Sequence, residues 1–233
     1  MGNIRPVVFL GAATGFHEIA EIIYDINRVK KCYELVAILD DNPEKHGKEL
    51  GGVKISGNLE LAHRWKEAFF VFGIGSVQNR MKRHEIIQRL NIPTERFLTL
   101  VHPNAKIYPD VKIGAGAIVH SGVVVGNGTE IGDFAITTFN TVIGPYCKIG
   151  RFVMVTTSVV CLTGVEIGAG AFIGAGSCLG EGIKIGPGAF IGMASALARN
   201  VEPGAYVLGN PPRTLYKVEV AAPLLADWCQ ENI

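Results

Sequence analysis

An excess of charge of either sign is missing from this chain of 233 residues. Its 22 lysines and arginines and 21 aspartates and glutamates give a net charge of only +1. A surface that binds nucleic acid or an acidic membrane needs a clear excess of basic residues, so this balance argues against both. Apolar runs also stay short of the ~18 residues that a membrane-spanning segment needs. We therefore expect a protein that contacts neither nucleic acid nor membrane.

Cysteine is sparse and irregularly placed. The five cysteines do not have the spacing of metal ligands, and their odd number and scatter are typical of reduced thiols in a cytoplasm. They are Cys32, Cys147, Cys161, Cys178 and Cys229. The sequence thus predicts a cytoplasmic protein without a bound metal.

The first hundred residues alternate between strand-like and helix-like patterns. Apolar runs typical of strands occupy residues 7–11, 34–41, 69–76 and 97–101, and helical patterns occupy residues 19–26, 58–68 and 79–90. This alternation predicts a small parallel sheet of βαβ units. Ligands of such sheets bind beyond the carboxyl ends of the strands. Here those ends carry two glycine loops and, between them, the pair Asp40-Asp41.

Residues 107–207 follow a period of six. An apolar residue recurs at every sixth position, and a small or β-branched residue stands four positions after each, as in the run Ile167, Ile173, Leu179, Ile185 and Ile191. Thr137 and Cys161 are the weak units, and Pro203 keeps the spacing. A six-residue period is typical of a parallel β-helix, whose stacked coils bury a continuous core. We expect three hexads in each coil, with Thr137 and Cys161 facing inward.

The combination of these features resembles one branch of the left-handed β-helix acyltransferases. The hexads, the glycine loop after the first strand, the segment 37–57 and the terminal "GNPPR" (209–213) resemble the nucleotide-sugar acetyltransferases related to bacillosamine N-acetyltransferase and sialic acid O-acetyltransferase. The resemblance implies an α/β domain over residues 1–103, a left-handed β-helix over 104–213 and a tail over 214–233. It also implies a homotrimer that transfers acetyl from acetyl-CoA to a nucleotide-linked, amino-bearing sugar in surface-polysaccharide or glycan biosynthesis.

In that family the N-terminal sheet holds the nucleotide sugar, usually UDP-linked. The resemblance places it beside three loops, with the candidate residues Gly11, Thr14, Gly15, His17, Asp40, Asp41, Gly75, Ser76 and Arg80. Backbone N–H groups at a helix N-terminus suit a phosphate, and an arginine could add a bidentate contact. Taken singly, glycines after strands and the sequence "DDNP" are ordinary turns. The three loops together favour a binding site, although Gly15 replaces the family's loop histidine and His17 stands where a basic residue is usual.

The resemblance also implies where the acyl donor binds. Acetyl-CoA would lie in a groove between two subunits, with its pantetheine arm against corners where small residues allow close approach. The candidates are Gly174, Ala175, Gly192 and Met193, with Arg213 near the phosphates at the adenine end. A β-helix needs small corner residues in any case, so coil packing is the alternative explanation.

The family's active site usually holds a histidine in a His-Asp pair, which takes a proton from the acceptor. Residues 136–159 contain no histidine. One alignment places Phe139 and Asn140 at the positions of the pair, and another places Pro145 and Tyr146 there.

Three hypotheses follow from this absence. The enzyme acylates a sugar amine without a side-chain base, using residues such as Asn140 only to position the acceptor. Alternatively, His120, which stands one coil before Thr138, is the base of a sugar O-acetyltransferase, although it could equally be a histidine that faces solvent. In the third hypothesis, the chain is a catalytically inactive trimer that binds nucleotide sugars.

Overall fold

The computed structural model describes residues 4–13, 15–77 and 79–231, with side chains as far as residue 226. The chain divides into two compact units, residues 1–103 and 104–233. Each unit is described by itself.

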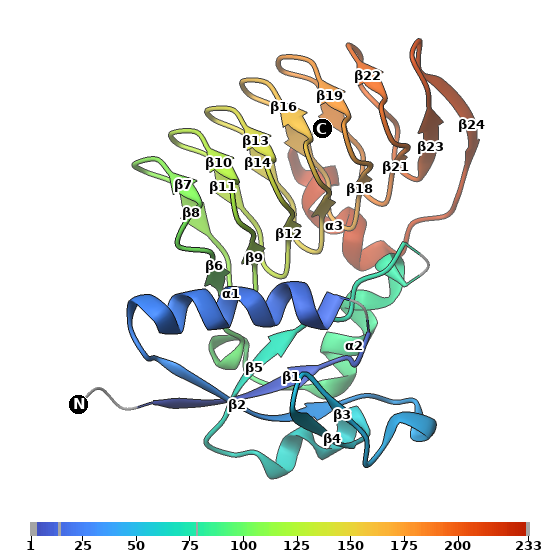
Figure 1. The fold of residues 1–233 in the computed structure, drawn as a ribbon. Coiled ribbons are helices and arrows are strands. Elements are labelled where there is room, and N and C mark those ends of the chain that lie inside the picture. The colour runs from blue at the N-terminus through green and yellow to red at the C-terminus, as the bar shows by residue number, and fades with distance from the viewer. Residues whose placement is uncertain (1–3, 14, 78, 232–233) are drawn as a thin grey trace. The chain divides into compact units, whose positions relative to one another are not determined.

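The N-terminal unit is a small α/β domain. Its elements are β1 (Arg5–Leu10), α1 (Gly15–Val29), β2 (Tyr33–Leu39), η1 (Pro43–Lys45), β3 (Glu49–Leu50), β4 (Val53–Gly57), η2 (Leu59–Arg64), β5 (Phe69–Phe72), η3 (Arg80–Lys82), α2 (Arg83–Leu90), η4 (Thr94–Arg96) and β6 (Leu100–Val101). The sheet has the order β3-β4-β2-β1-β5 (Figure 1). β1 pairs in parallel with both β2 and β5, which confirms the predicted parallel sheet.

Two features of this unit differ from the sequence-based expectation. The predicted helix over 58–68 is only the short 3₁₀ helix η2, which lacks a side-chain cap at Asn58 and buries only two residues. So short an apolar face cannot offset the cost of starting an α-helix. The hairpin of β3 and β4 was not predicted. It turns through Gly51 and Gly52, which both have positive φ and form the kind of glycine pair that favours a tight hairpin.

The C-terminal unit is the predicted left-handed parallel β-helix, made of two-residue strands that stack in three columns (Figure 1). The first column holds β7 (Lys106–Ile107), β10 (Val124–Val125), β13 (Val142–Ile143), β16 (Val160–Cys161), β19 (Cys178–Leu179) and β22 (Ala196–Leu197). The second holds β8 (Lys112–Ile113), β11 (Glu130–Ile131), β14 (Lys148–Ile149), β17 (Glu166–Ile167) and β20 (Lys184–Ile185). The third holds β9 (Ile118–Val119), β12 (Ile136–Thr137), β15 (Met154–Val155), β18 (Phe172–Ile173), β21 (Phe190–Ile191), β23 (Ala205–Leu208) and the antiparallel β24 (Arg213–Lys217). The helix α3 (Ala222–Glu231) follows.

The second residue of each two-residue strand of the β-helix points into the core, as the hexad register predicts. Val125 pairs with Ile143, and 143 − 125 gives 18 residues for each coil of three hexads. Both weak units face inward. Thr137 is fully buried and its hydroxyl donates to the Ile118 carbonyl at 3.4 Å, while Cys161 is buried as a small apolar residue. Burial of the Cys161 thiol raises its pKa far above the usual value, so the thiol stays protonated.

The expectation that Pro203 continues the register is wrong. Ile185 is bridged to Val201 and Ile191 pairs with Val207, and each of these separations is 16 residues. Val201 donates its backbone N–H to the Lys184 carbonyl. A proline has no N–H to donate at that position, so the last coil is two residues shorter and Pro203 falls outside the register.

Among the residues that the structure describes, no helix is long and apolar enough to cross a membrane.

Candidate functional site

A cavity of about 330 Å³ lies at the carboxyl ends of β1, β2 and β5 in the N-terminal unit. Its lining includes six of the nine residues that were predicted to hold a nucleotide sugar: Gly11, Gly15, Asp40, Asp41, Gly75 and Ser76. The three loops that carry these residues are therefore brought together around one space. Thr14, a seventh candidate, lies outside the described residues.

The Asp40 carboxylate ties the second of these loops to the first. One oxygen accepts the backbone N–H of Ala12 at 2.7 Å, and the other accepts that of Asn42 at 2.9 Å. Burial acts to raise the pKa of this carboxyl, but these hydrogen bonds and the ammonium of Lys45 outweigh burial and hold the pKa below its usual value. Asp40 is therefore ionised at neutral pH and keeps the first loop in place.

Lys45 is a lining residue of this cavity that sequence reasoning missed. Its ammonium lies 3.0 Å from the Asp40 carboxylate and donates to the Ala12 carbonyl at 2.8 Å. The short helix η1 folds the chain back after Asp40 and so brings Lys45 to the cavity, and the side chain of Asn42 caps η1 by accepting from the Glu44 N–H. A proline and an Asx cap in "DNPEK" could have signalled this turn.

The neighbouring carboxylate, Asp41, has different partners. It accepts the backbone N–H of Leu59 at 3.0 Å and forms an ion pair with Arg89 of α2 at 2.6 Å. Arg89 also lies 3.3 Å from Glu60, and its hydrogen bond to Asp41 raises the pKa of the guanidinium. The pair is half exposed, so we assign it a role in orienting the loop rather than a large contribution to stability.

The glycine at the end of β1 is required by geometry. Gly11 has φ +104°, and a Cβ atom placed there would lie 2.6 Å from Cγ1 of Ile74 in the third loop. Any larger residue would therefore strain the backbone and push the first and third loops apart.

Two of the residues predicted to contact the substrate, Arg80 and His17, do not line this cavity. Arg80 is buried (5% exposed), donates to the Val77 carbonyl at 2.9 Å and does not line the cavity, so its guanidinium supports the third loop from within the protein. His17 is exposed on α1 and lines a separate groove of about 340 Å³ with Tyr24 and Gly51. The phase of α1, which sequence alone does not fix, turns His17 away from the strand ends.

A second arginine that supports the third loop was also missed. Arg83 is fully buried, and its Nε donates to the Ile74 carbonyl at 2.9 Å. Its guanidinium lies over the Phe72 ring at 5.3 Å, and burial lowers its pKa to about 9. Arg83 therefore holds the backbone that faces Gly11.

The histidine of the hexads does not face solvent. His120 is 1% exposed, and its ring lies 4.7 Å from the ring of Phe139 one coil later. The alternative of a solvent-facing histidine is therefore wrong, because Phe139 covers the imidazole. Thr138, the residue before Phe139, has its hydroxyl hydrogen-bonded at 3.1 Å to the hydroxyl of Thr157.

Asn140, the other catalytic candidate, is exposed and occupies a corner in the left-handed region, with φ +56°. Asparagine tolerates this conformation better than most residues. Asn140 also lies against Gly122 of the preceding coil, where a Cβ atom would collide with its side-chain oxygen. The backbone conformation of this corner and its close contact with Gly122 therefore favour asparagine at position 140, independently of any role with a substrate.

The donor candidates lie in the last coils of the β-helix. A Cβ atom on Gly174 would stand 2.6 Å from the backbone nitrogen of Met193, and one on Gly192 would collide with the side chain of Leu208. Coil packing alone therefore requires Gly174, whose Cβ would meet backbone atoms, whereas the clash at Gly192 is with the end of the 40%-exposed Leu208 side chain, which can turn away. Ala175 is half-buried, Met193 is 76% exposed and Arg213 is exposed at the start of β24.

Comparison with known proteins found a family match in each part of the chain. Residues 10–89 match the model of the PglD N-terminal domain, and residues 99–127 match that of the bacterial transferase hexapeptide. The first segment lies in the N-terminal unit, and the second leads into the β-helix, so each unit is similar to one of these families. The resemblance inferred from the loops and the repeats is thus confirmed. No curated protein matches the sequence.

Three solved structures share this two-domain fold. The acetyltransferase domain of PglB from Neisseria gonorrhoeae FA1090 has a TM-score of 0.80 at 23% identity, over 91% of this chain and 100% of that one. PerB from Caulobacter crescentus, in complex with CoA and GDP-perosamine, has a TM-score of 0.77 at 21% identity, over 92% and 99%. WeeI from Acinetobacter baumannii AYE has a TM-score of 0.73 at 23% identity, over 90% and 100%. At these identities the likeness establishes the fold.

Proposed function

We propose that this protein transfers an acetyl group from acetyl-CoA to the amino group of a nucleotide-linked sugar. The observation that carries the proposal is the cavity at the strand ends, where six residues expected at a nucleotide-sugar site line one space. Two similar structures support it: the PglB acetyltransferase domain was solved with acetyl coenzyme A, and PerB with CoA and GDP-perosamine. We propose that the reaction serves the biosynthesis of surface polysaccharides or other glycans.

An amine acceptor fits the lack of an accessible histidine in the hexads. A neutral sugar amine attacks the thioester carbonyl, the C–S bond breaks, and the proton lost by nitrogen ends on the CoA thiolate or in water. The amine is already nucleophilic, so the protein needs chiefly to hold both reactants in a productive geometry. Asn140 and the 64%-exposed Tyr146 are the side chains that we assign to positioning the acceptor.

We infer further that the working form is a homotrimer, with acetyl-CoA between neighbouring copies against Ala175, Met193 and Arg213. Light scattering tests this assembly, because the monomer has a mass of 25.0 kDa. A monomer at working concentration would remove the proposed site for the donor.

The substrate is tested by calorimetry with a panel of UDP-, TDP- and GDP-linked sugars, followed by an assay of CoA release from acetyl-CoA. We expect at least one nucleotide sugar to bind, and CoA release with its amino form but not with its hydroxyl counterpart. CoA release with the hydroxyl sugar would instead indicate O-acetylation. Tight sugar binding without any CoA release would indicate the catalytically inactive binding protein.

Replacing His120 tests whether the reaction needs it. His120→Leu keeps most of the buried volume against Phe139. We expect it to lower kcat/KM by less than about tenfold, because amine acylation does not use His120 as a base. The loss of a true general base would typically lower the rate ~10²–10⁴-fold. Thermal unfolding of the variant controls for lost packing. A loss of about a thousandfold in a folded variant that still binds acetyl-CoA would show that His120 is the base.

A further inference from the structure

The third loop of the cavity, residues 74–77 after β5, is held from within the protein by two buried arginines. Arg83 donates from its Nε to the Ile74 carbonyl at 2.9 Å, and Arg80 donates to the Val77 carbonyl at 2.9 Å. Arg83 is 0% exposed and Arg80 is 5% exposed. Arginine is almost never fully buried unless it is paired, because the guanidinium loses its hydration. Two buried guanidinium groups behind one short loop are therefore an unusual feature of this domain.

The hydrogen bond to Ile74 fixes the direction of the peptide group that follows it. In a planar trans peptide, the C=O of one residue and the N–H of the next point in opposite directions. Since the Ile74 carbonyl points to the buried Arg83, the Gly75 N–H points away from that guanidinium. Gly75 is exposed and lines the cavity, as does Ser76. The peptide thus turns its carbonyl towards the protein interior and its hydrogen-bond donor the other way.

The charges on the cavity wall do not by themselves favour an anion. Of the described lining residues, Asp40 and Asp41 are acidic and Lys45 is basic, and the Lys45 ammonium already binds the Asp40 carboxylate. Burial lowers the pKa of Arg83 to about 9, which leaves its guanidinium charged at neutral pH. In the low dielectric of the protein interior, this charge favours an anion on the far side of the peptide.

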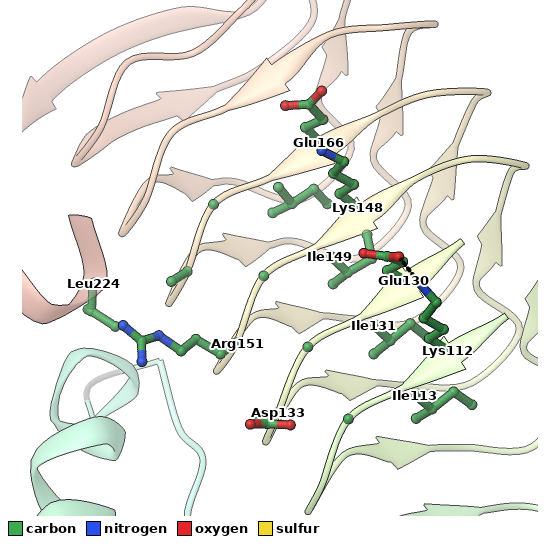
Figure 2. Close-up of a pocket in the computed structure, with 16 residues that line it drawn as sticks. Lys112, Ile113, Glu130, Ile131, Asp133, Lys148, Ile149, Arg151, Glu166 and Leu224 are labelled. Carbon is green, nitrogen blue, oxygen red and sulfur yellow. Dashed lines mark hydrogen bonds and ion pairs between the residues drawn. The ribbon is translucent and has the colours of Figure 1, made fainter. Parts of the chain in front are cut away.

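The larger groove on the β-helix differs in this respect. Its volume is about 440 Å³, and lysine and glutamate alternate along the second strand column that borders it (Figure 2). Lys112 lies 2.6 Å from Glu130, and Lys184 lies 3.1 Å from Glu166. These surface charges neutralise one another, so they give the groove little positive potential with which to attract an anion.

We propose that Arg83 is a positioning residue for the diphosphate of the nucleotide sugar. Its buried guanidinium turns the Ile74–Gly75 peptide so that the Gly75 N–H faces the cavity, and its charge favours the anion that this N–H binds. The Ser76 oxygen accepts the backbone N–H of Asn79 at 3.2 Å, which leaves the hydroxyl proton for a second hydrogen bond to the same anion. This inference rests on the proposed function, because it assigns the loop that holds the diphosphate of the proposed substrate.

Calorimetry with ligands that differ in charge tests the proposal. The probes are UDP, TDP and GDP, each compared with its uncharged nucleoside, which is measured by competition. We expect Arg83→Met to weaken binding of the diphosphate that the wild type prefers by about tenfold or more, and to change binding of the matching nucleoside less than about twofold. Arg83→Lys keeps a cation and a donor, so it should restore most of the loss. A merely structural role would lower both affinities together.

Arg96 offers a comparison at the other end of β5. Its Nε donates to the Ala68 carbonyl at 3.2 Å, and its guanidinium lies over the Phe70 ring at 4.8 Å. The Arg83 guanidinium lies over Phe72 of the same strand in a similar way, at 5.3 Å. Arg96→Met should lower the thermal stability without changing the ratio of diphosphate to nucleoside affinity. An Arg83→Met variant that behaves in the same way would overturn the proposal.

Gly75→Pro is the second variant, and it keeps the test decisive where Arg83→Met does not fold. It removes the N–H from an exposed loop residue and leaves both arginines in place. We expect the same selective loss of diphosphate affinity, and unchanged diphosphate binding would contradict the proposal. A wild type that binds none of the nucleoside diphosphates would overturn the inference and the proposed function together. Selective binding as expected, but without CoA release from acetyl-CoA, would overturn the proposed function alone.

Discussion

The Val119→Asp variant is expected to lose its folded β-helix. Val119 is fully buried in the third strand column and pairs with the buried Thr137 of the next coil, which in turn pairs with the buried Val155. A carboxylate at this position has no cationic partner, and an uncompensated buried charge costs several kcal/mol. Total stabilities of globular proteins are about 5–15 kcal/mol, so this one substitution removes a large part of the stability of the domain. Far-UV circular dichroism and urea unfolding measure the loss.

The matched control is Val142→Asp, the same exchange at an outward position. Val142 is 39% exposed beside the buried Ile143, so its carboxylate stays hydrated and the coil should remain folded, whatever the oligomeric state. If Val119→Asp unfolded at the same urea concentration as Val142→Asp, the assignment of inner and outer residues would be refuted.

The β-helix could be predicted almost completely because one inner residue fixes the register of a whole hexad. Even Thr137 and Cys161, which are not aliphatic, were placed inward by spacing alone, and the structure buries both. The prediction failed only where the coil changes length. Pro203 has the right spacing, but the register position needs a backbone N–H, which Val201 supplies. Spacing carries no information about which residue must donate a hydrogen bond.

The site in the N-terminal unit was predictable to the extent that strand ends determine it. Gly11 and Asp40 follow parallel strands that lie side by side, so the topology places them together. Side chains that arrive from other directions were not predictable. The direction of the His17 side chain depends on the phase of α1, and Lys45 reaches the cavity only because the chain folds back after Asp40. Whether Arg80 reaches the cavity depends on whether its long side chain points inward. Each of these depends on tertiary packing rather than on the local pattern.

The Asp40→Ala variant is expected to bind its nucleotide sugar about ten- to a hundredfold more weakly than wild type. The substitution removes the acceptor for the Ala12 and Asn42 N–H groups and the partner of Lys45. Hydrogen bonds to a charged group contribute about 1.5–3 kcal/mol each, and each 1.4 kcal/mol that reaches binding is tenfold in affinity. Calorimetry at fixed ionic strength measures the loss. Glu44→Ala removes a charge from the same turn without breaking these bonds, so it should bind as wild type does.

The pH dependence of binding tests the same carboxylate without a mutation. Although its burial opposes ionisation, the hydrogen bonds from Asn42, Ala12 and Lys45 keep the pKa of Asp40 below its usual value in the folded protein. A carboxyl group with a depressed pKa contributes its full stabilisation above the unfolded value of about 3.9, and the contribution is lost as the pH falls through the lower folded value. The part of the affinity that depends on Asp40 should therefore stay constant from pH 8 to pH 5. The ratio of wild-type to Asp40→Ala affinity isolates that part, since any titration of the ligand affects both proteins equally. A ratio that falls towards one between pH 7 and pH 5 would mean that Asp40 is protonated in this range and does not hold the loop as the structure indicates.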